Sequence, residues 1–339
     1  MRIRKSALQI LVNSLNVLNF GKSNMSQELF STMRVVALPT KTNFRGINIR
    51  EVALFQGEAG WGEFSPFLEY QPSECVPWLQ SAIEAASKPW PELKRSKVKV
   101  NGTIPALNEP SDIERIVEIF QGVNTFKVKV GDNLSEDIAR LAKVRALRPN
   151  AKLRIDVNGN WSVATAATNL LAIYENIGAI EYVEQPCQSV EELCELKTKL
   201  KVNIPIAGDE VLRKSADPFK VDLSGAVDIL ALKVQPLGGI ARAQKLAQHH
   251  NLPIVVSSAL ESAVGISHGL ALAASFNEMN FDCGLATGSL LSANVGGLQI
   301  VNGEIEVKRI EPNFEGLEVS PERYKWWQDR LMKTWELIA

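Results

Sequence analysis

The chain has 339 residues, of which 45% are hydrophobic, and a formal net charge of -1. This length and composition suffice for one large core or for two unequal domains. A charge so close to zero argues against a nucleic acid or an anionic membrane as partner. No apolar run approaches the roughly 20 residues of a membrane span, and no motif indicates a protein partner, which leaves small molecules as the expected ligands.

The cysteines and histidines are few. Any proton transfer is expected to use Lys, Asp or Glu, because none of the three histidines has a suitable partner in a motif. The cysteines form no CxxC pair or other zinc spacing, so we interpret them as reduced thiols of a cytoplasmic protein. They are Cys75, Cys187, Cys194 and Cys283.

The first residues stand apart from the rest. A basic start precedes four leucines at helical spacing, but asparagines interrupt the apolar face and no small-residue cleavage site follows. A secretory signal is therefore disfavoured. We interpret residues 1–25 as a disordered or dispensable extension, with Met25 as an alternative start. An amphipathic docking helix is the competing interpretation.

Two segments flank the predicted main domain. Residues 26–97 contain a strand, a glycine turn and a second strand in INIREVALFQGEAGWGEFSPF, then a helix near PSECVPWLQSAIEAA. Residues 301–339 contain a short strand pair around VNGEIEV and end in an aromatic helix. We expect both ends to meet as a small α+β cap over or beside the main domain, packed firmly because no low-complexity linker separates them.

Residues 98–300 contain eight apolar, strand-like runs that alternate with amphipathic helix patterns at intervals of roughly 25 residues. In SDIERIVEIFQG, for example, Ser111 and Glu114 can form a capping box ahead of an apolar face. Eight such units predict an α/β fold of the closed (β/α)8 barrel type, allowing for a modified last unit. The runs are VKVNGTI, FKVKV, LRIDV, IEYVEQ, IPIAG, ILALKV, PIVVSS and FDCGLA.

Polar side chains lie at the C-terminal ends of these predicted strands, where such barrels carry their chemistry. Singly, each is more often a helix cap or a solvated side chain than a catalytic group. Asp156, Glu184 and Asp209, however, would bring three carboxylates from successive strands to one rim. Their mutual repulsion calls for a cation, and oxygen ligands without His or Cys select Mg²⁺ first and Mn²⁺ second.

Two lysines are predicted to face each other across this rim. Lys129 and Lys233 end strands two and six, which are four apart in a ring of eight. Such a site suits abstraction of a proton α to a carboxylate, with one lysine as the base and with the metal and the other lysine stabilising the enediolate. Lys127 can lower the pKa of Lys129 as a nearby cation. The alternative is a half-exposed strand whose lysines meet water.

Several motifs, in this order and strand placement, resemble the muconate-lactonizing subgroup of the enolase superfamily: KVK, DVNGNW, EYVEQP, GDE and LKVQPLGGI. Others, with FRG, GWGEFSPFLEY, VNGTIPA and SSALES among them, resemble the o-succinylbenzoate synthase family of the actinobacterial type, over about residues 34–310. The barrel motifs together are specific for the superfamily. The cap and SSALES motifs point to the synthases less strongly.

The resemblance implies a Mg²⁺-dependent lyase that dehydrates 2-succinyl-6-hydroxy-2,4-cyclohexadiene-1-carboxylate to o-succinylbenzoate in menaquinone biosynthesis. It implies that Lys129 takes the α-proton and then protonates the departing hydroxyl, and that Lys233 stabilises the enediolate. The three carboxylates would bind Mg²⁺. Supporting or substrate-binding roles would fall to Lys127, Asn158, Glu210, Ser257, Ser258 and, in the cap, Arg45.

Three alternatives stay open. An N-acylamino-acid racemase or dipeptide epimerase would use the same metal and lysine pair, with both lysines exchanging protons with the substrate. A Schiff-base aldolase would use Lys129 or Lys233 as a nucleophile, although the carboxylate trio argues against it. A barrel without catalysis would serve as a binding protein, which the intact lysines and carboxylates make less attractive.

Overall fold

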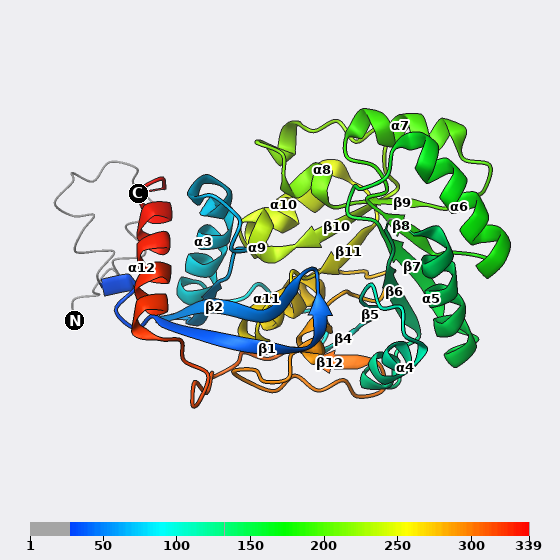
Figure 1. Ribbon diagram of the computed structural model, residues 1–339. Coiled ribbons are helices and arrows are strands. Elements are labelled where there is room, and N and C mark those ends of the chain that lie inside the picture. Colours follow the sequence, from blue (N-terminus) through cyan, green and yellow to red (C-terminus); the bar gives the residue numbers. More distant parts are fainter. Residues whose placement is uncertain (1–27, 132, 339) are drawn as a thin grey trace.

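The computed structural model describes residues 28–131 and 133–338, and the predicted extension of residues 1–25 lies outside them. The chain forms a barrel of strands and helices and a smaller cap that both chain ends build (Figure 1). Within the described residues, no helix combines the length and the apolar character that a membrane span requires.

Seven parallel strands form the barrel sheet, in the order β11-β10-β9-β8-β7-β6-β5. Their apolar runs are buried on both faces, as is usual when helices cover a parallel sheet. The strands are β5 (Gly102–Ile104), β6 (Thr125–Lys129), β7 (Lys152–Asp156), β8 (Tyr182–Glu184), β9 (Ile206–Gly208), β10 (Ile229–Lys233) and β11 (Ile254–Ser257).

Helices connect consecutive strands and surround the sheet (Figure 1). Two short helices replace a full one after β9: α8 (Glu210–Arg213) and the 3₁₀ helix η1 (Pro218–Lys220). After β10, the short helix α9 (Val234–Leu237) precedes a full helix. The full helices are α4 (Pro110–Ile119), α5 (Leu134–Leu147), α6 (Val163–Ile177), α7 (Val190–Lys199), α10 (Ile240–His250) and α11 (Ala263–Ser275).

The eighth predicted strand, FDCGLA, is reduced to backbone bridges that join the two ends of the sheet. Gly284 bridges Ser257 at the end of β11, and Cys283 bridges Val100 ahead of β5. A Cβ atom on Gly284 would lie 2.6 Å from Ser257 Oγ, so a larger residue here would force the Ser257 side chain to shift. The 3₁₀ helix η2 (Thr287–Leu290) follows directly. The last unit of the barrel is therefore modified.

The first predicted strand, VKVNGTI, was wrong as a single element. β4 (Lys97–Lys99) pairs antiparallel with β12 (Glu304–Glu306), whereas β5 pairs with β6 inside the barrel. Lys97 and Lys99 are exposed on either side of buried Val98, while β5 is buried throughout. The alternating half therefore suits a two-stranded surface sheet, and the other half suits the barrel.

The cap contains an antiparallel sheet of β1 (Arg34–Phe44), β2 (Ile47–Gly57) and β3 (Gly60–Phe64). Strands β2 and β3 were predicted from the sequence, whereas β1 was not. Helices α3 (Pro72–Ser87) and α12 (Pro321–Trp335) stand beside each other against this sheet (Figure 1). Trp78 and Trp327 belong to a hydrophobic core that both chain ends share. The cap thus has an apolar core of its own, while Val36 and Val52 of its sheet join the core of the barrel.

A tight turn closes the hairpin between β1 and β2. Arg45 and Gly46 have φ values of 57° and 77°, and Phe44 pairs with Ile47. Two central residues with positive φ are typical of the type I′ turn, whose twist matches that of the two strands. This turn places Arg45 at the tip of the hairpin.

Candidate active site

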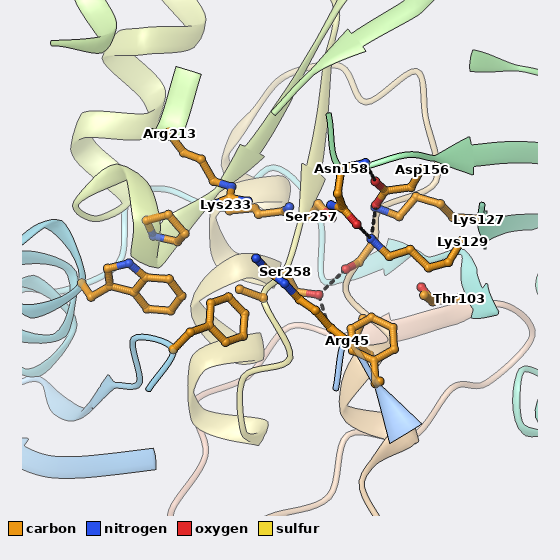
Figure 2. A pocket seen from close by; sticks show the side chains of 17 residues that line it. Arg45, Thr103, Lys127, Lys129, Asp156, Asn158, Arg213, Lys233, Ser257 and Ser258 are labelled. Atoms are coloured by element: carbon orange, nitrogen blue, oxygen red, sulfur yellow. Dashed lines mark hydrogen bonds and ion pairs between the residues drawn. The ribbon is translucent and has the colours of Figure 1, made fainter. Parts of the chain in front are cut away.

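A cavity lies where the C-terminal ends of the barrel strands meet the cap (Figure 2). Its free volume is about 40 Å³, which is room for no more than a few water molecules. The cap contributes Phe44, Arg45, Phe67 and Trp78. The barrel contributes Thr103, Lys127, Lys129, Asp156, Asn158, Arg213, Lys233, Pro236, Ser257, Ser258, Ala259, Gly284 and Thr287.

Two lysines enter this cavity from opposite sides. Figure 2 shows the side chains of Lys129 and Lys233 pointing toward one another, from β6 and β10 respectively. The side chains are only 17% and 9% exposed. The predicted arrangement of these two residues across the barrel mouth is therefore present.

Ammonium groups alternate with carboxylates around the mouth, beginning on β6. Lys129 Nζ lies 2.6 Å from Asp156 Oδ2. Lys127 Nζ lies 3.2 Å from the same oxygen and 2.9 Å from Glu184 Oε2. Because β6, β7 and β8 are consecutive in the sheet, their end residues come within ion-pair distance of one another.

The alternation continues on the following strands. Lys233 Nζ lies 3.8 Å from Glu184 Oε1 and 2.5 Å from Asp209 Oδ2. Arg213 Nε donates to both carboxylate oxygens of Asp209, at 3.0 and 3.1 Å. Arg213 lies four residues after Asp209, at the end of α8, and one helical turn brings it back to the same side.

Three further contacts close these pairs into a ring. Arg213 Nη2 donates to Glu210 Oε1 at 2.5 Å, and Asn158 Nδ2 donates to the same oxygen at 3.2 Å. Lys129 Nζ donates to Asn158 Oδ1 at 2.7 Å, which completes the circuit. We call this set the charge ring: Lys129, Asp156, Lys127, Glu184, Lys233, Asp209, Arg213, Glu210 and Asn158. With four cations and four carboxylates, its formal charge is zero.

The two facing lysines have pKa values that move in opposite directions. Burial lowers the pKa of Lys129, and the neighbouring ammonium of Lys127 adds to this effect although Asp156 opposes it. Burial also acts to lower the pKa of Lys233, but Asp209 and Glu184 outweigh it and the net shift is upward. Lys129 is thus the easier of the two to deprotonate, while Lys233 keeps its proton.

Burial and neighbouring charges also shift the pKa values of other residues in the charge ring. Burial acts against the charge of Lys127, yet Glu184 and Asp156 raise its pKa overall. Burial acts to raise the pKa of Asp156, but Lys129 and Lys127 hold it well below its usual range. Glu210 differs, because burial and the charge of Asp209 raise its pKa. Lys127 therefore remains a fixed positive charge beside Lys129.

The carboxylates suit a hard divalent cation by their chemistry. Asp156, Glu184 and Asp209 are at most 1% exposed, lie on neighbouring strands and offer only oxygen donors. Glu210 Oε2 is buried without a hydrogen-bond partner. Among the described residues, no three acidic, thiol or imidazole groups converge as a ligand cage. The ammonium of Lys127 lies between the carboxylates instead. The donor set fits the predicted metal, and binding would displace these contacts.

The structure places the remaining predicted residues at or near the cavity. Ser257 and Ser258 line it, although the hydroxyl of Ser258 already donates to Gly284 O and contacts Thr287 Oγ1. Arg45 also lines it, with its guanidinium 4.4 Å from the ring centroid of Phe67. Glu184, Asp209 and Glu210 lie behind the lining residues and belong to the charge ring.

Sequence reasoning missed two residues that link the ring to the cap. Arg213 was not identified, although its position four residues after Asp209 on a short helix is a usable signal. Its Nη1 donates to the phenol oxygen of Tyr70, which follows β3 in the cap, at 3.2 Å. No local pattern pointed to Tyr70, because its partner lies 143 residues away.

Comparisons with known proteins agree with this architecture. Residues 35–86 match the "Enolase N-terminal domain-like" family model, and residues 113–322 match "Enolase C-terminal domain-like". An o-succinylbenzoate synthase of Mycobacterium ulcerans is 43% identical over 318 residues, which cover 92% of this chain and 95% of the relative. That of Mycobacterium leprae is 44% identical over 319 residues, covering 92% and 94%. The chain belongs to the o-succinylbenzoate synthase family of the enolase superfamily.

Solved structures place this synthase-family chain within the same fold. A dipeptide epimerase from Enterococcus faecalis, complexed with Mg and L-Leu-L-Tyr, aligns with a TM-score of 0.68 at 21% identity over 83% of this chain and 97% of its own. Muconate lactonizing enzyme from Pseudomonas putida aligns with a TM-score of 0.66 at 18% identity over 87% and 97%. The predicted superfamily and capped-barrel fold are confirmed. Membership also points to a divalent metal ion as the cation.

Proposed function

We propose that this protein catalyses the Mg²⁺-dependent dehydration of 2-succinyl-6-hydroxy-2,4-cyclohexadiene-1-carboxylate to o-succinylbenzoate, the product that its relatives' name contains. The observation that carries the proposal is the facing lysine pair, Lys129 and Lys233, with pKa values shifted in opposite directions. One neutral amine and one ammonium on opposite sides of a carbon acid are what proton abstraction α to a carboxylate requires.

Lys129 is the proposed base. As a neutral amine it removes the proton α to the ring carboxylate, and the bonding electrons move into that carboxylate to give an enediolate. The same group, now an ammonium, donates this proton to the departing hydroxyl, so that water leaves and the ring becomes aromatic. The downward shift of its pKa favours the neutral amine that the first step needs.

Lys233 is the proposed electrostatic partner. Its raised pKa keeps it an ammonium, and it enters the cavity opposite Lys129. A fixed positive charge at a desolvated site stabilises the negative charge that develops in the enediolate. When bound by Asp156, Glu184 and Asp209, Mg²⁺ supplies further positive charge for the same purpose.

The charge of the site supports an anionic substrate. With Lys129 as the neutral base, the charge ring holds three cations and four carboxylates, so a divalent metal ion would leave one positive charge in excess. Arg45 of the cap adds a second positive charge at the cavity wall. The proposed substrate carries two carboxylates, one on the ring and one on the succinyl arm. Complementary charge of this kind favours both binding and orientation.

The cap must move for such a substrate to enter. A cavity of about 40 Å³ cannot hold it, and the hairpin tip with Arg45 stacked on Phe67 forms part of the cavity wall. We propose that this tip opens and closes over the substrate and that Arg45 then contacts it. We also assign the enzyme to the cytoplasm, in keeping with its four free thiols.

An alternative activity is the epimerization of N-acylamino acids or dipeptides. No contact of a described residue in the cavity favours it over the dehydration. The epimerase among the structural neighbours is 21% identical and shows the fold alone. The relatives that are 43% and 44% identical are synthases. Incubation with N-succinylamino acids in D₂O tests the alternative, because an epimerase would exchange the α-proton of these compounds for deuterium from the solvent.

Ultraviolet-monitored turnover of the cyclohexadiene substrate by purified protein tests the proposal directly. We expect conversion with Mg²⁺, loss of conversion with EDTA and recovery on adding Mg²⁺ back. Lys129→Ala should lower kcat by about 10³-fold or more, since it removes the proposed acid and base together. Absence of turnover by folded protein that binds Mg²⁺ would overturn the synthase assignment.

A further inference from the structure

One buried carboxylate of the cap reaches into the barrel beside the active site. Glu63 lies on β3 and is 2% exposed. Its two oxygens accept five hydrogen bonds, two of them from groups of Ser262 and the others from Ser65, Gln235 and Gly265. Four of these bonds cross from the cap to the barrel, so a single side chain joins the two parts.

The first link leads to the strand that carries Lys233. Gln235 Nε2 donates to Glu63 Oε1 at 3.2 Å, and Gln235 Oε1 accepts from the hydroxyl of Ser65 at 3.3 Å. Gln235 is 3% exposed and lies in α9, which begins at Val234, the residue directly after Lys233. A displacement of Gln235 would therefore move Lys233 through the single residue between them, Val234.

The second link leads to the helix that follows Ser257 and Ser258. Ser262 is the N-cap of α11, and its hydroxyl donates to Glu63 Oε2 at 2.5 Å while the amide of Gly265 donates at 2.9 Å. The positive end of a 13-residue helix thus meets a buried negative charge. This contact holds the start of α11 against the cap.

A neighbouring arginine fixes the turn between these serines and α11. Arg50 on β2 is 2% exposed, and its Nε donates to Leu260 O at 3.1 Å. Leu260 has a φ of 62°, a left-handed conformation that is unfavourable for leucine and persists only when its surroundings impose it. A second guanidinium nitrogen of Arg50 donates to Ser65 O. The cap therefore holds both barrel segments on this side of the cavity.

We infer that Glu63 is a positioning residue for Lys233, and that the cap sets the location of the Lys233 side of the active site through this carboxylate. The inference rests on the proposed function for its effect on turnover. The Lys129 side has no bond to Glu63 or Gln235 among the described contacts, and Lys129 takes its partners Asp156 and Asn158 from the end of β7 and the loop after it. Loss of Glu63 should displace one of the two lysines and leave the other in place.

The chain offers a matched control. Glu84 on α3 is also a cap carboxylate at the start of a barrel helix, since its Oε1 accepts from the amides of Ile240 and Ala241 in α10, at 2.5 and 3.3 Å. It has no bond to Gln235 or Ser262 among the described contacts. Glu63→Gln and Glu84→Gln each weaken the docking of the cap, but only the first breaks the link to Lys233.

The test compares Glu63→Gln, Glu84→Gln and Gln235→Met for kcat, KM, Mg²⁺ affinity and hydrogen exchange. We expect Glu63→Gln and Gln235→Met to lower kcat roughly 10- to 100-fold, because a misplacement of about 1 Å costs this much. Mg²⁺ affinity should change in the same two variants, since Lys233 Nζ contacts the proposed ligands Asp209 and Glu184. Glu84→Gln should lower kcat by less than about threefold.

Hydrogen exchange decides the matter independently of turnover. In Glu63→Gln, amides of residues 229–237 and 258–268 should exchange faster, whereas in Glu84→Gln only those of 238–247 should. Equal losses of kcat in the two glutamate variants, or unchanged exchange at 229–237 in both Glu63→Gln and Gln235→Met, would overturn the inference. If the wild type shows no turnover, the proposed function fails and the exchange pattern alone supports or overturns the positioning role. If Glu63→Gln does not fold, Gln235→Met carries the test.

Discussion

Two buried polar clusters lie inside the same barrel, one at its mouth and one at its floor. The mouth holds the charge ring. At the floor, Arg154 is fully buried, and its Nε donates to Glu181 Oε2 at 2.6 Å while its Nη1 donates to Asn101 Oδ1 at 3.0 Å. Strand β7 supplies both clusters, because Arg154 and Asp156 are two residues apart and point to the same face.

Burial of charge by itself does not distinguish the two clusters. Arg154 lies over the ring of Tyr182 at 4.7 Å and is not among the described residues that line the active-site cavity. The mouth differs in two respects, since its lysines face a cavity and one of them, Lys129, is shifted toward its neutral form. We therefore interpret the floor as a structural plug and the mouth as the reacting centre.

The largest expected effect comes from removing a charge at the mouth. Lys233→Met should lower kcat by about 10³-fold, the equivalent of about 4 kcal/mol, because it removes the ammonium opposite the base. Stopped-flow or steady-state turnover measures the loss, and circular dichroism verifies folding. If the variant retained more than a tenth of wild-type kcat, Lys233 would not take part in the mechanism. The mouth and the floor would then no longer differ in their effect on turnover.

Removing the charge at the floor should act on stability instead. Arg154→Met leaves Glu181 with only the exposed Lys152 as ion-pair partner and removes the donor to Asn101 Oδ1, so it should lower the free energy of unfolding by about 2–3 kcal/mol. Urea denaturation measures this change. The folded fraction should keep a kcat within about tenfold of the wild type. A loss of kcat comparable to that of Lys233→Met would show that the floor takes part in catalysis.

Another buried carboxyl group lies near the mouth but outside the charge ring. Glu261, in the turn before α11, has its pKa raised to about 7, first by burial and next by the charge of Glu63. An acid with a raised folded-state pKa stabilises the fold only while protonated, so this stability falls as pH rises from about 4.5 through 7 and stays low above it.

Glu261→Gln should remove this pH dependence. The variant should be more stable than the wild type by up to about 3 kcal/mol at pH 8, whereas the two proteins should be nearly equal near pH 4. Urea denaturation across this pH range measures both. A constant difference between the two proteins at every pH would contradict the shifted pKa.

The smallest expected effect concerns the link between the ring and the cap. Tyr70→Phe removes the hydrogen bond from Arg213 and should cost about 1 kcal/mol of stability, with kcat and KM within about threefold. Thermal denaturation and turnover measure these changes. Tyr174→Phe, at a 39% exposed position, is the matched control and should change neither. A larger loss of kcat in Tyr70→Phe would make this contact part of the catalytic machinery.

The barrel and most of its site were predictable from local patterns. Apolar, strand-like runs alternate with amphipathic helices, and the residues that end each strand must meet at one rim in a parallel barrel. Lys129, Asp156, Glu184 and Lys233 were placed in this way, and all belong to the charge ring. The split of VKVNGTI was not predictable, because its alternating half pairs with a strand about 200 residues later.

The sequence by itself determined the order of strands and helices and the identity of the charged groups at the barrel mouth. Both follow from hydrophobic periodicity and from the order of strands along the chain, which are local properties. Only the tertiary structure decided which charged groups form ion pairs. It also decided that Arg213 completes the charge ring and that Glu63 of the cap accepts a hydrogen bond from Gln235, close to Lys233. These contacts join residues far apart in the chain. The opposite pKa shifts of Lys129 and Lys233 follow from them, since desolvation and Coulomb interaction depend on distance in space and not on spacing along the sequence.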